Sequence, residues 1–181
     1  MKILFTGFLP FSTHKENPSK ILAEELASFF SMPYRILSVS YIRAPIELAD
    51  SMEKEKPDFI LSLGLHAGAK ALRIEEFAYN LKQASLPDED GISMQGSPIN
   101  VNLPESIPNP LPLPKCLEEW KGYPFVLSDD PGRFVCNLVY FHDLSSGIPS
   151  LFVHLPPFEI IPKEKQLEAL IALVKSIHAF F

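Results

Sequence analysis

Three residue types in this chain of 181 residues could together carry out nucleophilic chemistry. Cys136 follows a stretch rich in turn-forming residues, at a point where a helix is expected to begin. The positive end of a helix dipole favours the thiolate, which is the nucleophilic form of cysteine. His154 ends an apolar strand pattern and could accept a thiol proton and return it to a leaving amine. Glu75 could hold that imidazole in one tautomer and offset its charge.

Each of these residues also has an ordinary structural interpretation. An isolated cysteine is often buried and inert, a histidine often makes a structural hydrogen bond, and a glutamate at a strand edge is often solvated. Sequence spacing does not decide between the alternatives, because cysteine and histidine partners become neighbours only through the fold. Phe8 and Phe11 pose the same choice: two rings after the first strand could enclose a small flat ligand or simply cover the core.

Sequence motifs for other chemistries are missing. There is no Walker phosphate loop, no dinucleotide-binding glycine pattern, no serine nucleophile elbow and no zinc-protease helix motif. The remaining histidines show no metal-ligand spacing and are interpreted as surface or satisfied residues: His14, His66, His142 and His178. We therefore expect neither a metal nor a cofactor.

Composition narrows the compartment and the partners. The formal net charge of −6 disfavours a nucleic-acid partner, because such a partner needs a clustered basic face. No window approaches the roughly 18 apolar residues of a membrane span, and the first apolar run is shorter than the roughly 7–15 residues of a signal sequence. Two cysteines do not suggest a disulfide scaffold, and we assign Cys116 to a helix without a catalytic role. We therefore expect a cytoplasmic protein that binds no membrane.

The elements that must position these residues follow from the hydrophobic pattern. Strands are expected at 3–6, 34–40, 59–63, 71–80, 124–128 and 151–154, and helices at 18–31, 45–55, 114–121, 136–144 and 164–180. This alternation predicts an α/β fold whose mostly parallel sheet is covered on both faces, in one domain over residues 1–181. Ligands of such sheets bind at the carboxyl ends of the strands. We expect Phe8, Phe11, Glu75, Cys136 and His154 to meet there.

Two local features of the chain refine this prediction. Asn17 is a plausible N-cap of the first helix, with Pro18 at its first position. Six prolines occur from Pro98 to Pro114, so no helix or central strand is expected there. That segment is either a surface crossover or a lid beside the site.

Several short motifs occur in one order along the chain, with Ser128 and Gly132 among them. They are Gly7-Phe8-Leu9-Pro10-Phe11, Asn17-Pro18-Ser19, Gly64-Leu65, Glu75-x-x-Ala78-x-Asn80, Leu86-Pro87-Asp88-x-x-Gly91, Phe134-Val135-Cys136-Asn137 and Phe152-Val153-His154-Leu155-Pro156. In order and spacing, from residue 1 to about 158, they resemble the pyroglutamyl peptidase I (pyrrolidone-carboxylate peptidase) family of cysteine peptidases. The resemblance implies a three-layer α/β/α sandwich and removal of N-terminal pyroglutamyl residues from peptides. It leaves a homo-oligomer open.

The same resemblance implies the roles of the three catalytic candidates. Cys136 would be the nucleophile, His154 the general acid and base, and Glu75 the carboxylate that orients the imidazole. Attack by the thiolate would give an acyl-enzyme, which water would then hydrolyse.

The resemblance also implies the substrate pocket. Phe8 and Phe11 would clamp the pyrrolidone ring, the backbone of Phe134 would face the lactam, and Asn17 would support the pocket loop. Such a site should reject analogues that lack the lactam groups, because its buried polar groups would then be left unpaired.

Two positions depart from the resemblance. The family usually has arginine directly after the catalytic glutamate and shortly before its Ile-Pro-Asp motif, whereas this chain has Glu76 and Ser85. Loss of two basic groups beside a developing oxyanion would reduce charge stabilisation. The alternative to the peptidase is therefore a non-catalytic protein that binds pyroglutamate or another small molecule on the same fold. A third alternative, a nucleoside phosphorylase-like enzyme on a related sandwich, would need a phosphate-binding loop that the sequence lacks.

Overall fold

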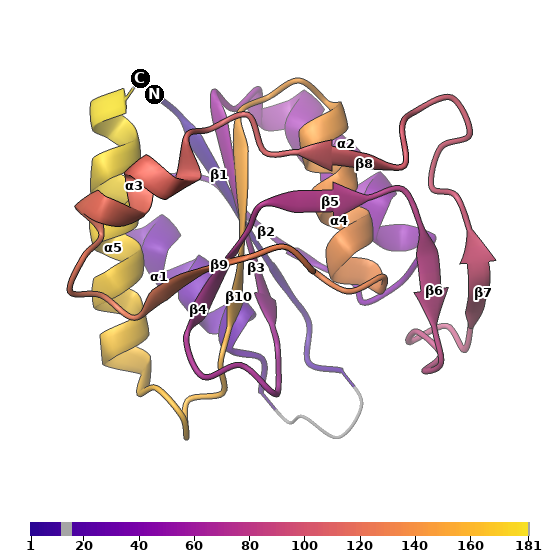
Figure 1. Cartoon of the computed structure of the whole chain (residues 1–181), viewed down its shortest axis with the longest axis horizontal. Helices are drawn as coiled ribbons and strands as arrows, with labels where there is room; N and C mark the ends of the chain where they lie inside the picture. Colours follow the sequence, from indigo (N-terminus) through magenta and orange to yellow (C-terminus); the bar gives the residue numbers. More distant parts are fainter. Residues whose placement is uncertain (12–15, 181) are drawn as a thin grey trace.

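The computed structural model describes residues 1–11 and 16–180, and a six-stranded sheet lies at its centre (Figure 1). The strands of this sheet are β1 (Ile3–Phe8), β2 (Tyr34–Leu37), β3 (Phe59–Leu65), β4 (Leu72–Glu75), β9 (Phe125–Ser128) and β10 (Ser150–Leu155). Their order across the sheet is β2-β1-β3-β10-β4-β9. β1 and β10 are buried along their whole length and β3 along all but its last residue, which explains their near-continuous apolar sequences.

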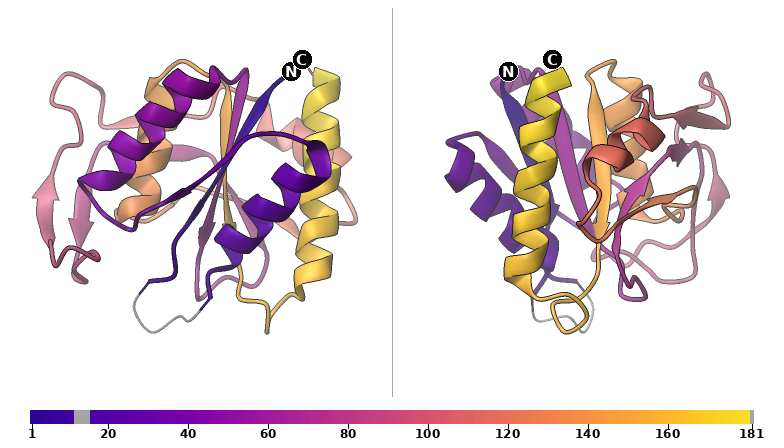
Figure 2. Two further views of the ribbon diagram at one scale, coloured as in Figure 1. Left: turned by 180° about the vertical axis from the view of Figure 1, so that it is seen from behind. Right: turned by 60° about the vertical axis from the view of Figure 1, so that its left-hand side comes forward.

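Helices cover both faces of the sheet. They are α1 (Pro18–Phe30), α2 (Arg43–Glu55), α3 (Leu113–Glu119), α4 (Val135–Ser145) and α5 (Lys163–Phe180). One hydrophobic cluster joins α1, α3 and α5 to one face of the sheet, and a second joins α2 and α4 to the other. The two views of Figure 2 show the same division, with α1 and α5 on one side and α2 and α4 on the other. The expected α/β/α sandwich is confirmed.

Strand direction differs from a fully parallel sheet at one edge. β2, β1, β3 and β10 are parallel, but β4 pairs antiparallel with β10, and β9 follows β4. The expectation that Glu75 lies at the shared carboxyl edge is therefore wrong. Glu75 instead comes close to His154 across the antiparallel ladder, where Arg73 lies opposite His154 and Ile74 opposite Val153. Alternation along β4 puts Arg73 and Glu75 on the same face.

The start of α1 contacts the end of β1. Asn17 caps the helix as predicted, its Oδ1 accepting from the Ser19 backbone N–H at 3.1 Å, and Pro18 occupies the first turn. A Cβ on Gly7 would lie 2.3 Å from the Ser19 carbonyl oxygen, so only glycine lets β1 and α1 pack backbone to backbone. This contact holds the end of β1 against the first turn of α1.

The segment between β4 and α3 forms two small sheets. The expected strand 71–80 is interrupted at Glu76, giving β4 and then β5 (Phe77–Tyr79), which pairs with β8 (Ser106–Pro108). β6 (Lys82–Ala84) pairs with β7 (Met94–Ser97). Because proline has no backbone N–H to donate, this proline-rich segment forms short edge strands and no longer ones. Figure 1 shows this region on the α4 side of the molecule. In the described part of the chain, no helix is both long and apolar enough to cross a membrane.

Candidate active site

Three side chains from three separate elements form one hydrogen-bonded series. Glu75 comes from the end of β4, His154 from β10 and Cys136 from the first turn of α4. The Nδ1 atom of His154 lies 2.8 Å from Oε1 of Glu75, and the same ring is hydrogen-bonded to the Cys136 thiol. Glu75 and His154 are buried, whereas Cys136 is partly exposed. The structure therefore brings together the thiol, imidazole and carboxylate that the sequence singled out.

The surroundings of His154 favour its protonated form. Burial alone would lower the pKa of the imidazole, because it removes water from the charged ring. The hydrogen bonds and the negative charges of Cys136 and Glu75 outweigh burial and raise that pKa to about 9. The geometry therefore suits a thiolate–imidazolium pair supported by a carboxylate.

A glycine on β3 makes room for the sulfur. A Cβ atom built on Gly64 would lie 2.9 Å from Sγ of Cys136 and 2.8 Å from Cζ of Phe152. Real Cβ atoms essentially never approach heavy atoms so closely. Gly64 thus allows the thiol to lie directly against the sheet, where it can reach the imidazole of β10.

The loop into α4 delivers the thiol to a helix N-terminus. Gly132 adopts a positive φ of 75°, and the chain then passes through extended backbone at Phe134 before the helix begins. No side-chain hydrogen bond caps α4. The first-turn amides, including that of Cys136, therefore lie at the positive end of the helix dipole without a side-chain cap.

A small aromatic cavity opens beside Cys136. Its volume is about 180 Å³, below the roughly 300–1,000 Å³ usual for drug-sized ligands, so it suits a group the size of one residue. Its lining includes every predicted pocket residue together with the thiol: Phe8, Phe11, Asn17, Phe134 and Cys136. Apolar side chains form most of the remaining wall, including Val39, Leu65 and Leu86.

Aromatic rings that line or border the cavity contact one another. Phe11 faces Phe134, with ring centroids 5.6 Å apart, and Tyr41 meets Phe134 edge-on at 5.5 Å. Phe8 lines the cavity too but is only 2% exposed, so it serves as its floor. Burial and the negative charge of Asp88 raise the pKa of Tyr41 to about 12, which keeps its hydroxyl neutral. Sequence patterns did not indicate Tyr41.

Asn17 connects the backbone at Leu9 to the start of α1. Its Nδ2 donates to the Leu9 carbonyl at 3.1 Å, while its Oδ1 accepts from the Ser19 hydroxyl at 2.8 Å. One side chain thus caps α1 and binds the backbone of Leu9, which lies between Phe8 and Phe11 in the sequence.

Comparison with known proteins agrees with this geometry. The family model described as pyroglutamyl peptidase matches residues 1–173. The chain belongs to the pyroglutamyl peptidase family. The pyrrolidone-carboxylate peptidase of Pyrococcus furiosus is 33% identical over 180 residues, covering 90% of this chain and 85% of the relative. That of Thermococcus litoralis is 33% identical over 181 residues, covering 90% and 80%. A solved structure of a mutant pyrrolidone carboxyl peptidase from Pyrococcus furiosus has a TM-score of 0.90 at 28% identity, with both chains fully covered.

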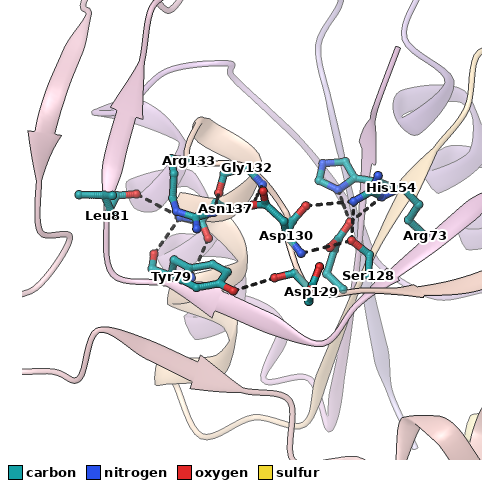
Figure 3. Close-up of polar contacts among 11 residues, drawn as sticks. Arg73, Tyr79, Leu81, Ser128, Asp129, Asp130, Gly132, Arg133, Asn137 and His154 are labelled. Atoms are coloured by element: carbon teal, nitrogen blue, oxygen red, sulfur yellow. Dashed lines mark hydrogen bonds and ion pairs between the residues drawn. The ribbon is translucent and has the colours of Figure 1, made fainter. Parts of the chain in front are cut away.

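In this pyroglutamyl peptidase, two polar side chains of α4 form hydrogen bonds with the backbone of the segment around Glu75. Asn137 exchanges two hydrogen bonds of 2.8 Å with the backbone of Tyr79, as Figure 3 shows. Tyr140 donates its hydroxyl proton to the Glu75 carbonyl at 2.7 Å and accepts from Asn109. Tyr140 lies four residues after the cysteine, so helix periodicity could have indicated that it shares the same face. Both contacts tie the helix that carries the thiol to the segment that carries the carboxylate.

A second histidine, His66, lies beside His154. The interpretation of His66 as a surface or satisfied residue is wrong. The ring of His66 meets that of His154 edge-on at 5.6 Å, and its buried Nδ1 has no partner within the described residues. Burial, and then the charges of His154 and Arg73, lower the pKa of His66. His14 and the side chain of His178 lie outside the described part of the chain. In that part, no group of three or more acidic, cysteine or histidine side chains could hold a metal.

Proposed function

We propose that this pyroglutamyl peptidase hydrolyses the bond after an N-terminal pyroglutamyl residue by using Cys136, His154 and Glu75 as its catalytic side chains. The observation that carries this proposal is the hydrogen-bonded series from the thiol through the imidazole to the carboxylate, opening on a cavity lined by aromatic rings. A cysteine omega-peptidase needs a thiolate next to a slot for a single flat residue, and both features occur together here.

The first half of the reaction forms an acyl-enzyme. The Cys136 thiolate attacks the carbonyl carbon of the pyroglutamyl residue, and the electron pair of the carbonyl moves to its oxygen. When that oxyanion collapses, the carbon–nitrogen bond breaks and the imidazolium of His154 protonates the departing amine. The peptide leaves with a free amino group, and the pyroglutamyl group stays on the sulfur as a thioester.

The second half restores the enzyme. Neutral His154 takes a proton from water, and the resulting hydroxide attacks the thioester carbon. The carbon–sulfur bond breaks, free pyroglutamate leaves, and the thiolate–imidazolium pair re-forms. Glu75 stays hydrogen-bonded to Nδ1 throughout and keeps the imidazole in one orientation.

Backbone groups and rings complete the proposed site. The first-turn amides of α4 would hold the oxyanion, because they carry partial positive charge and no side chain caps the helix. The pyrrolidone ring would lie in the cavity against Phe8 and Phe11, with the Phe134 backbone facing the lactam. Asn17 would support this pocket through its hydrogen bond to the Leu9 carbonyl.

The alternative of a non-catalytic binding protein gains no support. Its motivation was the absence of arginine at Glu76 and Ser85, but all three catalytic candidates are present and in contact. An arginine on β4, Arg73, lies beside Glu75 in this chain. A single domain over residues 1–181, a cytoplasmic location and a homo-oligomer remain predictions. Both cysteines are free, which suits a reducing compartment.

One assay tests the proposed function. The release of a fluorescent amine from a pyroglutamyl amide would be measured for the wild type, Cys136→Ala and Cys116→Ala. We expect Cys136→Ala to lose at least about 10³-fold in kcat, because the nucleophile is gone. Cys116→Ala serves as the matched control and should keep wild-type turnover, since Cys116 is buried in α3. Equal turnover by Cys136→Ala and wild type would refute the mechanism.

A further inference from the structure

An arginine outside the thiol–imidazole–carboxylate series contacts its buried end. Nε of Arg73 lies 3.6 Å from Oε1 of Glu75, the same oxygen that meets His154. The Arg73 side chain is 28% exposed, whereas the carboxylate is completely buried. Within the described residues, Arg73 and His154 are the two cationic groups that form ion pairs with Glu75.

The other end of the Arg73 guanidinium holds the loop that leads to the nucleophile. One terminal nitrogen donates to Oγ of Ser128 at 2.6 Å and to the carbonyl of Asp130 at 3.1 Å. Figure 3 shows Arg73 of β4 beside Ser128, the last residue of β9, and near Asp130 in the segment that follows it. The loop continues through Phe134 to Cys136. One planar group therefore spans from the carboxylate to the chain that carries the thiol.

The ion pair between Arg73 and Glu75 matters because His154 changes its charge during the proposed reaction. While the imidazole is protonated, it offsets the buried charge of Glu75. When the imidazole becomes neutral, Arg73 is the remaining cation paired with that carboxylate in the described part of the chain. A guanidinium stays charged at every working pH, and a buried carboxylate without a charged partner is strongly unfavourable.

We infer that Arg73 is a positioning residue for this site: its Nε forms an ion pair of 3.6 Å with the Glu75 carboxylate, and its terminal nitrogen holds the end of β9 and the loop that follows it. This role deepens the proposed function and rests on it. Arg73 does not touch the reacting atoms, so it acts on the rate through the orientation of His154 relative to Cys136. Other groups facing the imidazole are Cys136 on α4, Glu75 on β4 and His66 after β3.

Substitutions at both anchors test the inference. Arg73→Met keeps the apolar stem, and Arg73→Lys keeps the charge but cannot make both contacts at once. We expect kcat on a pyroglutamyl amide to fall about 10- to 100-fold for Arg73→Met and to be only partly restored by Arg73→Lys, with KM within about twofold of wild type. Arg35→Met is the matched control, because Arg35 is exposed on the far edge strand β2 and should keep wild-type kinetics.

A double-mutant comparison separates positioning from general destabilisation. Ser128→Ala removes one of the two loop-side partners of Arg73 and leaves the Asp130 carbonyl in place. We expect the pair Arg73→Met with Ser128→Ala to be no slower than Arg73→Met, because Arg73→Met has already removed the contact with Ser128. Additive losses, or an Arg73→Met kcat within about twofold of wild type, would overturn the inference. So would a change confined to KM.

A readout without turnover keeps this test separate from the proposed function. The rate of Cys136 alkylation by iodoacetamide would be measured at neutral pH in a Cys116→Ala background. We expect Arg73→Met to alkylate several-fold more slowly than wild type and Arg35→Met to match it, since a displaced imidazole stabilises the thiolate less. If the wild type cleaved no pyroglutamyl amide, the proposed function would fail. Unchanged alkylation in Arg73→Met would sink the inference alone.

Discussion

At the scale of single residues, the imidazole of His154 connects both halves of the site and should set the alkaline limit of activity. Its pKa is raised to about 9 by its thiol and carboxylate partners despite burial. Below that value the ring holds the proton that the leaving amine needs, and above it the proton is lost. We expect kcat/KM to fall as pH rises through about 9, tested by rate profiles from pH 6 to 10.5. A rate that stays flat to pH 10.5 would contradict this role.

The carboxylate next to this ring allows the same argument to be tested from the other side. Glu75→Gln keeps the shape of the side chain but removes its negative charge, which helps to raise the pKa of His154. The alkaline limb of kcat/KM should therefore move to lower pH, and kcat should fall by about 10²–10⁴-fold because the imidazole loses its orienting partner. Glu76→Gln is the matched control on the next residue and should leave the limb in place. A limb that moved in neither variant would argue against the triad.

Specificity belongs to the same scale, because it depends on a few polar contacts in a small cavity. A prolyl amide has the five-membered ring but lacks the lactam carbonyl and carries a charged amine. We expect kcat/KM for the prolyl amide to be about 10⁴-fold lower than for the pyroglutamyl amide, because backbone groups near Phe134 would be buried without partners. Parallel assays of the two amides check this. Similar values would indicate that ring packing alone selects the substrate.

At the scale of elements, the site depends on a close approach of β3 to α4, which leaves no room for a side chain at Gly64. Gly64→Ala would place a methyl group 2.9 Å from the Cys136 sulfur and 2.8 Å from Phe152. We expect loss of most activity together with about 1–3 kcal/mol of stability, measured by kinetics and urea unfolding, because a packed core resists an added methyl. Gly68→Ala is the matched control, as its Cβ would meet nothing closer than 3.4 Å. Wild-type kinetics in Gly64→Ala would show that the thiol need not lie against the sheet.

The sequence predicted most elements of this fold because their signals are local. The N-cap at Asn17 and the apolar runs of β1, β3 and β10 depend only on residues that are close in the sequence. The structure confirms them. The direction of β4 was not predictable in this way, because it depends on pairing with a strand about 80 residues away. The break at Glu76 was missed for the same reason, since it separates pairing with β9 from pairing with β8.

The candidate site was only partly accessible to the same reasoning. Motifs in register indicated Cys136, His154 and Glu75, and the structure brings these side chains together. Arg73 and Tyr140 belong to no distinctive motif, and their contacts with Glu75 become visible only in the fold. Alternation along β4 and the four-residue spacing on α4 were the available signals. Neither signal could identify a partner across the sheet.

At the scale of the whole molecule, a polar chain crosses the packed interior between the sheet and α4. The Thr6 hydroxyl donates to Ser62 Oγ at 2.8 Å, and Ser62 donates to Oδ2 of Asp143 at 2.7 Å. Asp143 is completely buried, and its Oδ1 has no partner within the described residues. Burial raises the pKa of this carboxyl to about 8, although the Ser62 hydrogen bond opposes the shift. Interior packing thus favours a neutral acid at this position.

This buried acid should make the stability of the protein depend on pH. Unfolded Asp143 would release its proton near pH 3.9, whereas folded Asp143 keeps it up to about pH 8. Between these values the folded state holds the extra proton, so this group's contribution is complete below about pH 4 and falls by up to about 1.4 kcal/mol per pH unit until about pH 8. Urea unfolding from pH 4 to 9 should therefore show Asp143→Asn gaining stability relative to wild type as pH rises, with no further gain above about pH 8.

The comparison with Asp143→Asn isolates this group from the rest of the molecule. The raised pKa of His154 also lowers stability as pH rises from about 6.5 to about 9, but it does so equally in both proteins and cancels in their difference. Asp50→Asn is the matched control, because Asp50 is exposed on α2, and its unfolding free energy should follow that of wild type at every pH. Parallel curves for Asp143→Asn and wild type would mean that the buried carboxyl releases its proton at the same pH in both states. The polar chain from Thr6 would then have to stabilise a buried carboxylate.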